Sequence, residues 1–384
     1  MPAPVLHTDV IIAGGGPVGL YLAGILLQKN ISVMILEQKT EIDRHSKSLG
    51  IHPVSLELFN EAGIADGFIN RGLKIEKGMA FVDDQMKGEL SFMDGPGPFN
   101  FILALPQYLT EDILEAWVQS LSPGALIRGA TVNEIHQTEK KVTVRWKKDG
   151  EDFTADCNFL AGCDGKNSFV RQRIGIRTKG AAYPDTYIMG DFSDNTEFGS
   201  KAAIYLHREG LIESFPLPDS YRRWVAKTDQ YIENPRREML QELIESRIGH
   251  SLHQQKNNML SSFGVQHQLA EEFFTGRILL AGDAAHVVSP IGGQGMNLGW
   301  INAHLLAESL LKATVHPRKR NTIFREYSKR GSRIARKAAR RAEMNMWMGR
   351  KQNLPFFKSA LVHLMVNTPF SKIALRRFTM RGLI

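Results

Sequence analysis

The first forty residues alternate between short apolar runs and glycines. An apolar run from Val10 to Ala13 leads directly into a glycine-rich segment, which is followed by periodic apolar positions from Leu20 to Leu27. A second apolar run, from Val33 to Leu36, ends in an acidic residue. Short continuous apolar runs are typical of buried parallel strands, and the longer periodic segment is typical of a helix. The pattern predicts a strand–helix–strand unit.

The glycines of this unit have the spacing of a dinucleotide-binding turn. Gly14 makes the tight turn, Gly16 lets a pyrophosphate approach the backbone, and Gly19 lets the helix pack closely on the strand. The N-terminus of the helix then faces the phosphates with free N–H groups and its positive dipole end. Glu37 lies where an acidic residue accepts hydrogen bonds from a ribose 2′-hydroxyl and repels a 2′-phosphate. The unit therefore predicts FAD or NAD rather than NADP, and does not choose between the first two.

A second polar loop follows an apolar run late in the chain, in the stretch RILLAGDAAHVVSPIGGQGMN at 277–297. The run ends at Gly282 and Asp283, so that a carboxylate can meet a ribityl or ribose hydroxyl. Pro290 and the glycines at 292, 293 and 295 let a flat ring lie on the backbone. The helix predicted after them points its positive end at the ring edge that gains negative charge on reduction. A reduced flavin needs that support and nicotinamide does not, so this loop favours FAD.

A third motif lies between these two, in FLAGCDGKNSFVRQRIGI at 159–176, where Asp164 and Gly165 follow an apolar strand end. The three motifs, in this order and at these separations, resemble those of the class A FAD-dependent monooxygenases related to para-hydroxybenzoate hydroxylase. The resemblance also covers 48–64, 105–116 and 215–218. It implies an α/β (α+β overall) architecture in which a Rossmann-like FAD-binding domain is interleaved with a β-sheet substrate domain. A helical C-terminal region is expected after them from the residue pattern described below.

The resemblance also implies domain ranges and cofactor contacts. The expected FAD-binding domain comprises 1–74, 105–182 and 274–315, the substrate domain 75–104 and 183–273, and the basic helical C-terminal region 316–384. The positions expected to contact FAD or to link it to NAD(P)H are Gly14, Gly16, Pro17, Gly19, Glu37, Gln107, Asp164, Gly282, Asp283, Pro290, Gly293, Gly295, Met296 and Asn297. Arg44 and Lys47 complete this set at a place where the family usually has an arginine. A lysine there is a point charge rather than a bidentate fork.

The activity implied by the resemblance is NAD(P)H-dependent hydroxylation, or other oxygenation, of an aromatic or polyketide-like molecule through a flavin hydroperoxide. The expected cofactors are non-covalent FAD, with NADPH or NADH as the electron donor, and no metal. Two alternatives stay open: a FAD-dependent reductase of an isoprenoid or quinone on the same fold, and a Baeyer–Villiger or epoxidising variant.

The substrate domain contains two segments, 201–218 and 221–229, that are predicted as strands of a sheet over the flavin. Tyr205 and His207 lie two residues apart and therefore share one side of such a strand. Either side chain could bind a phenol and take its proton, or both could face solvent at the edge of the sheet. By resemblance, Phe215 to Pro218 form the turn next to the substrate. The sequence names no catalytic base.

Composition indicates the class of protein and its cellular compartment. The chain has 384 residues, 43% hydrophobic and 23% charged, as is ordinary for a soluble protein of more than one domain. Two cysteines cannot build a disulfide framework, the N-terminus does not resemble a signal peptide, and no apolar run is long enough to span a membrane. A cytoplasmic protein is therefore expected, with its oligomeric state open.

Charge is distributed unevenly. Residues 316–384 carry 18 Lys and Arg against two acidic residues, a net charge of +16, whereas residues 1–315 carry −8. Within 330–352, Ile334, Ala338, Ala342 and Met346 recur at helical spacing, which predicts a helix docked by this stripe with its basic face in solvent. Steering of an acidic substrate and contact with an anionic membrane surface are the other interpretations. No nucleic-acid motif accompanies the charge, so nucleic acid is not an expected partner.

Overall fold

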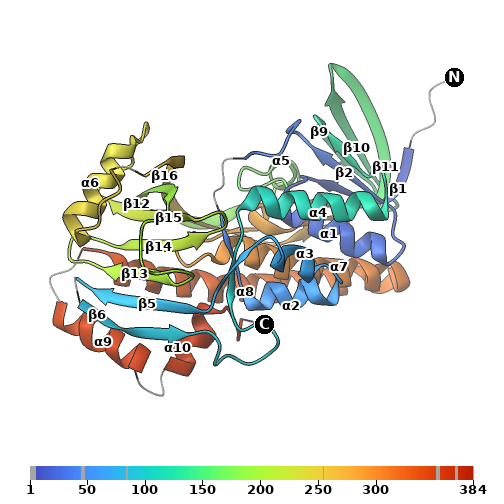
Figure 1. Cartoon of the computed structure of the whole chain (residues 1–384). Coiled ribbons are helices and arrows are strands. Elements are labelled where there is room, and N and C mark those ends of the chain that lie inside the picture. The colour runs from blue at the N-terminus through green and yellow to red at the C-terminus, as the bar shows by residue number, and fades with distance from the viewer. Residues whose placement is uncertain are drawn as a thin grey trace.

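The computed structural model describes residues 6–44, 48–83, 85–253, 255–351, 355–367 and 371–383. They form a mixed α/β architecture with two large sheets, which Figure 1 shows side by side. Helices cover both sheets, and the long helix α8 (Arg320–Gly349) runs from one toward the other. The predicted fold class is confirmed.

The first sheet contains the N-terminal unit. Its main order is β17–β18–β11–β1–β2–β8, with β10 pairing on β11 and β9 on β10. Its strands are β1 (Leu6–Ala13), β2 (Val33–Glu37), β8 (Leu126–Arg128), β9 (Thr131–Gln137), β10 (Val142–Lys148), β11 (Glu151–Gly162), β17 (Phe274–Thr275) and β18 (Ile278–Leu280). Strand β1 is parallel to both β2 and β11, and β11 is parallel to β18. The carboxyl ends of these strands therefore bring the three glycine-containing motifs to one edge of the sheet.

Helices surround this sheet and bury its apolar strands. They are α1 (Pro17–Gln28), α2 (Pro53–Glu61), α3 (Ala65–Ile69), α4 (Gln107–Leu121), α5 (Phe169–Arg173) and α7 (Gln294–Val315), with a 3₁₀ turn η1 (Gly282–Ala284) after β18. Helix α1 packs against both α4 and α7, and α7 packs against α8. The predicted strand–helix–strand unit is thus confirmed as β1, α1 and β2.

The second sheet has the order β19–β16–β12–β15–β14–β13–β5–β6 and is antiparallel except between β5 and β13. Its strands are β5 (Lys77–Val82), β6 (Gln85–Ser91), β12 (Thr178–Ser193), β13 (Ala202–Leu206), β14 (Ile212–Leu217), β15 (Tyr221–Thr228), β16 (Asn257–Ala270) and β19 (His286–Val287). A small antiparallel sheet of β3 (Gly50–Ile51), β7 (Ile102–Ala104) and β4 (Leu73–Ile75) connects the two regions. Strands were correctly predicted in 201–218 and 221–229.

The two faces of the second sheet pack against different helices. On one face, Leu240 and Ile244 of α6 (Arg237–Ile248) are in an apolar cluster with Ile212 and Trp224. We call this the α6 face. A separate cluster contains Val225, Leu206 and Tyr187 of the sheet, together with Met346 of α8 and Ile291 of the glycine loop. We call this the loop face, because the late glycine loop packs on it.

The C-terminal region is helical, as predicted. It comprises a 3₁₀ turn η2 (Pro317–Lys319) and the helices α8, α9 (Pro355–Asn367) and α10 (Ser371–Phe378). All four residues of the predicted stripe are buried, while Arg333, Arg336, Lys337 and Arg340 are exposed. Trp347, beside the stripe, stays 40% exposed. The burial pattern confirms a helix docked by this stripe with its basic face exposed.

The C-terminal region contacts both sheets. From α8, the Tyr327 hydroxyl donates a hydrogen bond to the Leu280 carbonyl oxygen of β18 (2.6 Å). Helix α9 packs against β5 and β6. Near the end of the chain, Arg381 forms an ion pair with Glu57 of α2 (2.6 Å). The positive charges of the C-terminal region therefore pair with acidic groups of the rest of the chain, at Arg381 and also at Arg350 and Lys351.

The strands of the first sheet all lie within the ranges predicted for FAD binding. The second sheet takes its strands from the ranges predicted for substrate binding, with two extensions: β12 starts at Thr178, and β19 comes from the late loop. The division into domains stays a prediction. Within the described part of the chain, no helix combines the length and apolarity needed to cross a membrane.

Candidate cofactor and substrate site

The turn after β1 has the geometry that its glycines predict. Gly14 has φ +106°, and a Cβ added there would overlap the Cys163 carbonyl oxygen. A Cβ on Gly19 would overlap the Gly14 carbonyl oxygen. In contrast, a Cβ on Gly16 would meet nothing within 4 Å. Gly14 and Gly19 are thus required by the fold, whereas Gly16 leaves open space at the N-terminus of α1, beside Pro17.

Glu37 lies at the end of β2, and its carboxylate is held against this turn. It accepts hydrogen bonds from the backbone N–H of Gly15 (2.6 Å) and of Lys39 (2.8 Å). These two bonds fix the half-buried carboxylate beside the open space at Gly16. The arrangement suits recognition of ribose hydroxyls.

Asp164 shapes the loop after β11. Its carboxylate accepts hydrogen bonds from the Ser168 hydroxyl (2.6 Å) and from the N–H of Val170 (3.0 Å), while Ser168 caps α5. Burial raises the pKa of Asp164. The buried Arg171 guanidinium donates to the carbonyl oxygens of Ala284 (2.9 Å) and Lys166 (2.8 Å). Arg171 thereby joins this loop to the one that carries Asp283.

Asp283 follows β18 and differs from its neighbours in solvent exposure. Its side chain is exposed, although Gly282 and Ala284 on either side are buried. No hydrogen bond joins its carboxylate to a described residue. Surrounding protein atoms desolvate this carboxyl and raise its pKa to about 6, while the charge of Lys166 acts in the opposite direction. An accessible, unpartnered carboxylate of this kind fits a ligand hydroxyl.

The late glycine loop bends through left-handed backbone and starts α7. Gly292 has φ +87°, and Gly293, with φ +66°, is the residue that caps the helix. Pro290 is exposed, and Gly295 and Met296 are partly exposed in the first turn. The N-terminus of a 22-residue helix therefore lies beside accessible backbone, as a flat, negatively charged ring would require.

Asn297 has a role that its sequence context did not reveal. Its fully buried amide donates to the carbonyl oxygens of Gly50 and Gly293 and accepts from the N–H of His52 and the hydroxyl of Ser55, each at 2.8 Å. The side chain joins the late loop to the segment around α2. Because all of its hydrogen-bonding groups are used, it positions the loop instead of offering its amide to a ligand.

The other residues expected to contact the cofactor, Gln107, Arg44 and Lys47, lie in different surroundings. Gln107 begins α4, and its amide donates to the Glu111 carboxylate (2.8 Å). Arg44 is exposed, with its guanidinium 5.7 Å from the centre of the Tyr108 ring. Lys47 lies outside the described residues. Among those residues, no group of three or more His, Cys, Asp or Glu side chains could hold a metal ion.

These observations fit FAD on three separate counts. Open space lies at Gly16, an accessible unpartnered carboxylate lies at Asp283, and exposed backbone precedes α7. Gly16 and Asp283 come shortly after the carboxyl ends of β1 and β18, two strands of the first sheet. The exposed backbone before α7 belongs to the loop that continues from Asp283. The carboxyl ends of the strands form the edge at which open α/β sheets bind dinucleotides.

Tyr205 lies on the face of the second sheet opposite the late glycine loop, whereas His207 lies beyond the end of its strand. Tyr205 is buried in the cluster of the α6 face, and its ring stacks on Phe81 with centroids 4.4 Å apart. Neither the substrate-facing nor the solvent-edge interpretation of this tyrosine fits that position. His207 is buried just beyond the end of β13, and its Nδ1 accepts from the N–H of Glu209 (3.2 Å). Ile291 of the loop packs on the face opposite Tyr205, so we do not retain Tyr205 as a substrate contact. The assignment of His207 stays a prediction.

The segment from Phe215 to Pro218 also differs from its prediction. Residues 215–217 belong to β14, and the turn follows at Asp219 and Ser220, both with positive φ. Pairing with β15 keeps Phe215 to Leu217 extended, because Phe215 lies opposite Arg223 and Leu217 opposite Tyr221.

The loop face carries two buried polar residues that the sequence analysis missed. Glu213 of β14 is 7% exposed and Tyr187 of β12 is 1% exposed. Glu213 lies opposite Ile204 and Val225, which both pack on this face. A carboxyl within an apolar strand, in register with inward-facing residues, was the signal available in the sequence.

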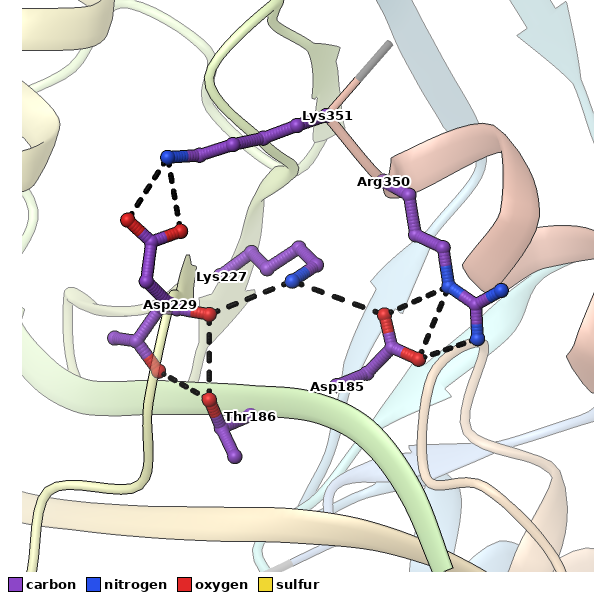
Figure 2. Close-up of polar contacts among 7 residues, drawn as sticks. Asp185, Thr186, Lys227, Asp229, Arg350 and Lys351 are labelled. Atoms are coloured by element: carbon purple, nitrogen blue, oxygen red, sulfur yellow. Dashed lines mark hydrogen bonds and ion pairs between the residues drawn. The ribbon is translucent and has the colours of Figure 1, made fainter.

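An ion-pair network crosses the end of this face (Figure 2). The buried Asp185 carboxylate accepts from the Arg350 guanidinium (3.0 and 2.6 Å), and the Lys227 ammonium lies 3.7 Å away. Lys351 pairs with Asp229 (2.8 Å) nearer the surface. The pair with Asp185 raises the pKa of Arg350. The network connects the end of α8 to β12 and β15.

Known proteins resemble both the sequence and the fold. Rifampicin monooxygenase of Streptomyces venezuelae is 32% identical over 299 residues, which is 76% of this chain and 61% of the relative. The 12-dehydrotetracycline 5-monooxygenase/anhydrotetracycline 6-monooxygenase of Streptomyces rimosus is 32% identical, over 78% of this chain and 61% of the relative. The chain thus spans less than two thirds of the length of these curated relatives.

Among solved structures, OxyS anhydrotetracycline hydroxylase from Streptomyces rimosus superposes with a TM-score of 0.81 at 27% identity, over 98% of this chain and 76% of the other. The p-nitrophenol 4-monooxygenase PnpA from Pseudomonas putida gives a TM-score of 0.89 over 99% of both chains. Its identity of 20% supports the fold alone. The family model described as FAD binding domain matches residues 7–342. The chain therefore belongs to this FAD-binding family, and FAD is its cofactor.

Proposed function

We propose that this protein is a FAD-dependent monooxygenase that oxygenates an aromatic or polyketide-like small molecule. The main support is that curated relatives matching more than three quarters of the chain are named as monooxygenases of such compounds. In the proposed reaction, NAD(P)H, dioxygen, a proton and the substrate give NAD(P)⁺, water and a product with one added oxygen atom. Pentachlorophenol 4-monooxygenase of Sphingobium chlorophenolicum, 27% identical, supports a phenol as one possible substrate class.

Three groups of residues would hold FAD. The turn at Gly14, Gly16 and Gly19 would take the pyrophosphate at the N-terminus of α1, and Glu37 would accept hydrogen bonds from the adenosine ribose. Asp283 would accept from the ribityl chain. The backbone of the late loop and the start of α7 would carry the ring, while Asn297 holds that loop against residues 50–55.

Bound FAD supplies the redox chemistry, accepting a hydride from NAD(P)H and activating dioxygen. The protein contributes positioning and exclusion of water. On the loop face, Ile291 packs in an apolar cluster that includes Tyr187, Met189 and Val225. Such a surface shields a reactive centre from water and binds an aromatic ring by burial. The positive end of the α7 dipole would stabilise negative charge on the reduced ring.

Oxidation of NADPH and NADH under air, with and without phenols and polyketide aromatics, tests this proposal. Oxidation that a substrate accelerates, with one oxygen atom gained by that substrate, supports it. Equal substrate turnover without oxygen would instead identify an isoprenoid or quinone reductase. A lactone or epoxide product would identify a Baeyer–Villiger or epoxidising enzyme. The same assay assigns the electron donor.

The C-terminal region supports this function through the fold. Its buried stripe and its contacts with β18 and β12 are what a docked region requires. Beside the late loop, a small cavity is lined by Gln294 of α7, Arg341 and Asn345 of α8, and Arg377 and Phe378 of α10. We therefore infer that residues 316–384 help to hold the flavin loop. Co-sedimentation with anionic vesicles tests the membrane alternative, and cell fractionation tests the expected cytoplasmic location.

A further inference from the structure

Glu213 is a buried carboxyl with no partner. Among the described residues, no hydrogen bond or ion pair involves its carboxyl oxygens, and the residue is 7% exposed. Burial is the one cause that raises its pKa to about 7. The other acids on the strands of this face differ, because Asp191 is bonded to Arg223 (2.6 and 2.8 Å) and Asp185 to Arg350. A carboxyl that is buried without compensation destabilises the fold and therefore needs an explanation.

The position of Glu213 relates it to the cofactor loop. In β14, Ile212 packs in the α6-face cluster, so the alternation of a strand directs Glu213 to the opposite face. Its cross-strand neighbours Ile204 and Val225 belong to the cluster that includes Ile291. Glu213 therefore lies on the face on which the late glycine loop packs.

Tyr187 presents a second unpartnered group on that face. Its ring stacks on Phe263 of β16 with centroids 5.3 Å apart, and its buried hydroxyl has no hydrogen-bond partner within the described chain. Burial and, next in size, the charge of Glu213 raise the pKa of Tyr187. The hydroxyl thus stays protonated and can donate a hydrogen bond. An acceptor and a donor share one apolar face, and neither is satisfied by the protein.

We propose that Glu213 and Tyr187 bind the hydroxyl group of a phenolic substrate, with Glu213 accepting its proton and Tyr187 donating a hydrogen bond to the same oxygen. This inference rests on the proposed function. The substrate O–H bond breaks and a carboxyl O–H bond forms, while the electron pair stays on the phenolate oxygen. Delocalisation of that pair makes the ortho and para ring carbons more nucleophilic, as oxygenation requires. The proton can return to the product oxygen, so no co-reactant is needed.

The surrounding charges leave Glu213 free to titrate. The titratable and charged groups that the packed elements bring to this face are Tyr183, Asp185, Tyr187 and Asp191 of β12, Arg223 and Lys227 of β15, Glu343 of α8, which accepts from the Tyr183 hydroxyl, and Arg350 just after α8. The two arginines are paired with Asp191 and Asp185, and Lys227 also lies near Asp185. None of them pairs with Glu213. A base whose pKa lies near neutral pH is suited to reversible proton transfer.

The experiment uses 4-nitrophenol and related nitrophenols as probes, titrated into FAD-loaded protein without NAD(P)H. The phenolate absorbs visible light and the neutral phenol does not, so absorbance reports the proton directly. At a pH above about 7, where Glu213 is ionised, and with a nitrophenol that is still mostly neutral in free solution, wild-type protein should bind the probe as phenolate. Glu213→Gln should bind it as neutral phenol, and Tyr187→Phe should lower the phenolate fraction. Glu209→Gln, an exposed acid on the loop before β14, is the matched control and should behave as wild type.

The same variants are then assayed with any phenol that the wild type oxygenates. Glu213→Gln should lower kcat by about 100-fold or more, with a small change in KM, because the loss is one of acid–base catalysis. Equal phenolate fractions in wild type and Glu213→Gln would overturn the inference, as would wild-type protein that binds no nitrophenol or binds it only in the neutral form. If wild type oxygenates phenols and the variant is unaffected, the proposed function stands and this inference fails. If wild type ionises the probe without oxygenating any phenol, the binding pair stands and the proposed function fails.

Discussion

Arg350, the residue that follows α8, forms a bidentate ion pair with Asp185, a buried residue of β12 that lies 165 positions earlier in the chain. Figure 2 shows the adjacent Lys351 pairing with Asp229 in the same network. The two pairs are neighbours and differ in burial. The Asp185 side chain is 1% exposed, whereas that of Asp229 is 74% exposed.

This difference gives the first prediction. Arg350→Ala should lower the free energy of unfolding by about 1–3 kcal/mol, because it leaves the buried Asp185 with Lys227 alone. Lys351→Ala is the matched control and should cost less than about 1 kcal/mol, since its pair is exposed. Urea unfolding of both FAD-loaded variants measures the difference. Equal effects would show that the Arg350 pair does not anchor α8.

The glycines of the first turn give a second prediction. Gly19→Ala should destabilise the protein by about 1–3 kcal/mol, because the new methyl overlaps the Gly14 carbonyl oxygen. Gly16→Ala should change the stability of the FAD-free protein by less than about 0.5 kcal/mol, since its methyl meets only open space. The same methyl should weaken FAD binding, because it occupies the side that the pyrophosphate approaches. Thermal unfolding and FAD titration separate the two effects. A Gly16→Ala variant with wild-type FAD affinity would place the pyrophosphate elsewhere.

Asp283→Asn should weaken FAD binding and stabilise the FAD-free protein. Loss of a charge-assisted hydrogen bond of about 1.5–3 kcal/mol corresponds to roughly 10- to 150-fold weaker binding. The folded-state pKa of about 6 exceeds the ordinary 3.8, so ionisation of Asp283 makes the FAD-free fold less stable as pH rises from about 4 to 6. The asparagine side chain does not ionise, so the free energy of unfolding of the FAD-free variant should exceed that of the wild type at pH 7. The difference should disappear below about pH 4.

Two measurements check this prediction: FAD fluorescence titration, and unfolding of the FAD-free protein at several pH values. Asp219→Asn, an exposed turn residue, is the control for a simple change in charge. Wild-type FAD affinity in Asp283→Asn would contradict the assigned contact. An unchanged pH dependence of stability would contradict the raised pKa.

Local patterns predicted the parts of the site that depend on local backbone. Gly14, Gly19 and the loop before α7 could be placed because turn geometry and strand ends are encoded within a few residues. The helical stripe of α8 could be predicted for the same reason, since its period is visible in the sequence.

Features set by distant partners could not be predicted. Asn297 is satisfied by residues near position 50, a relationship that no local spacing reveals. Strand alternation correctly separates neighbouring residues onto two faces, but it does not say which face a helix will cover. Tyr205 was therefore left between a substrate contact and a solvent-facing position, although the packing of α6 buries it on the far face. Glu213 was missed because its isolation becomes visible only when α8 and the late loop are packed on the sheet.

The proposed reaction is tested most directly by supplying FAD-loaded protein with NAD(P)H, a phenol or polyketide aromatic that stimulates NAD(P)H oxidation, and dioxygen labelled with oxygen-18. Mass spectrometry of the product locates the label. The account predicts one labelled oxygen atom in each product molecule, none when the label is placed in water instead, and no product when oxygen is removed. A product that forms equally well without oxygen, or that takes its oxygen from water, would contradict the proposed monooxygenase activity.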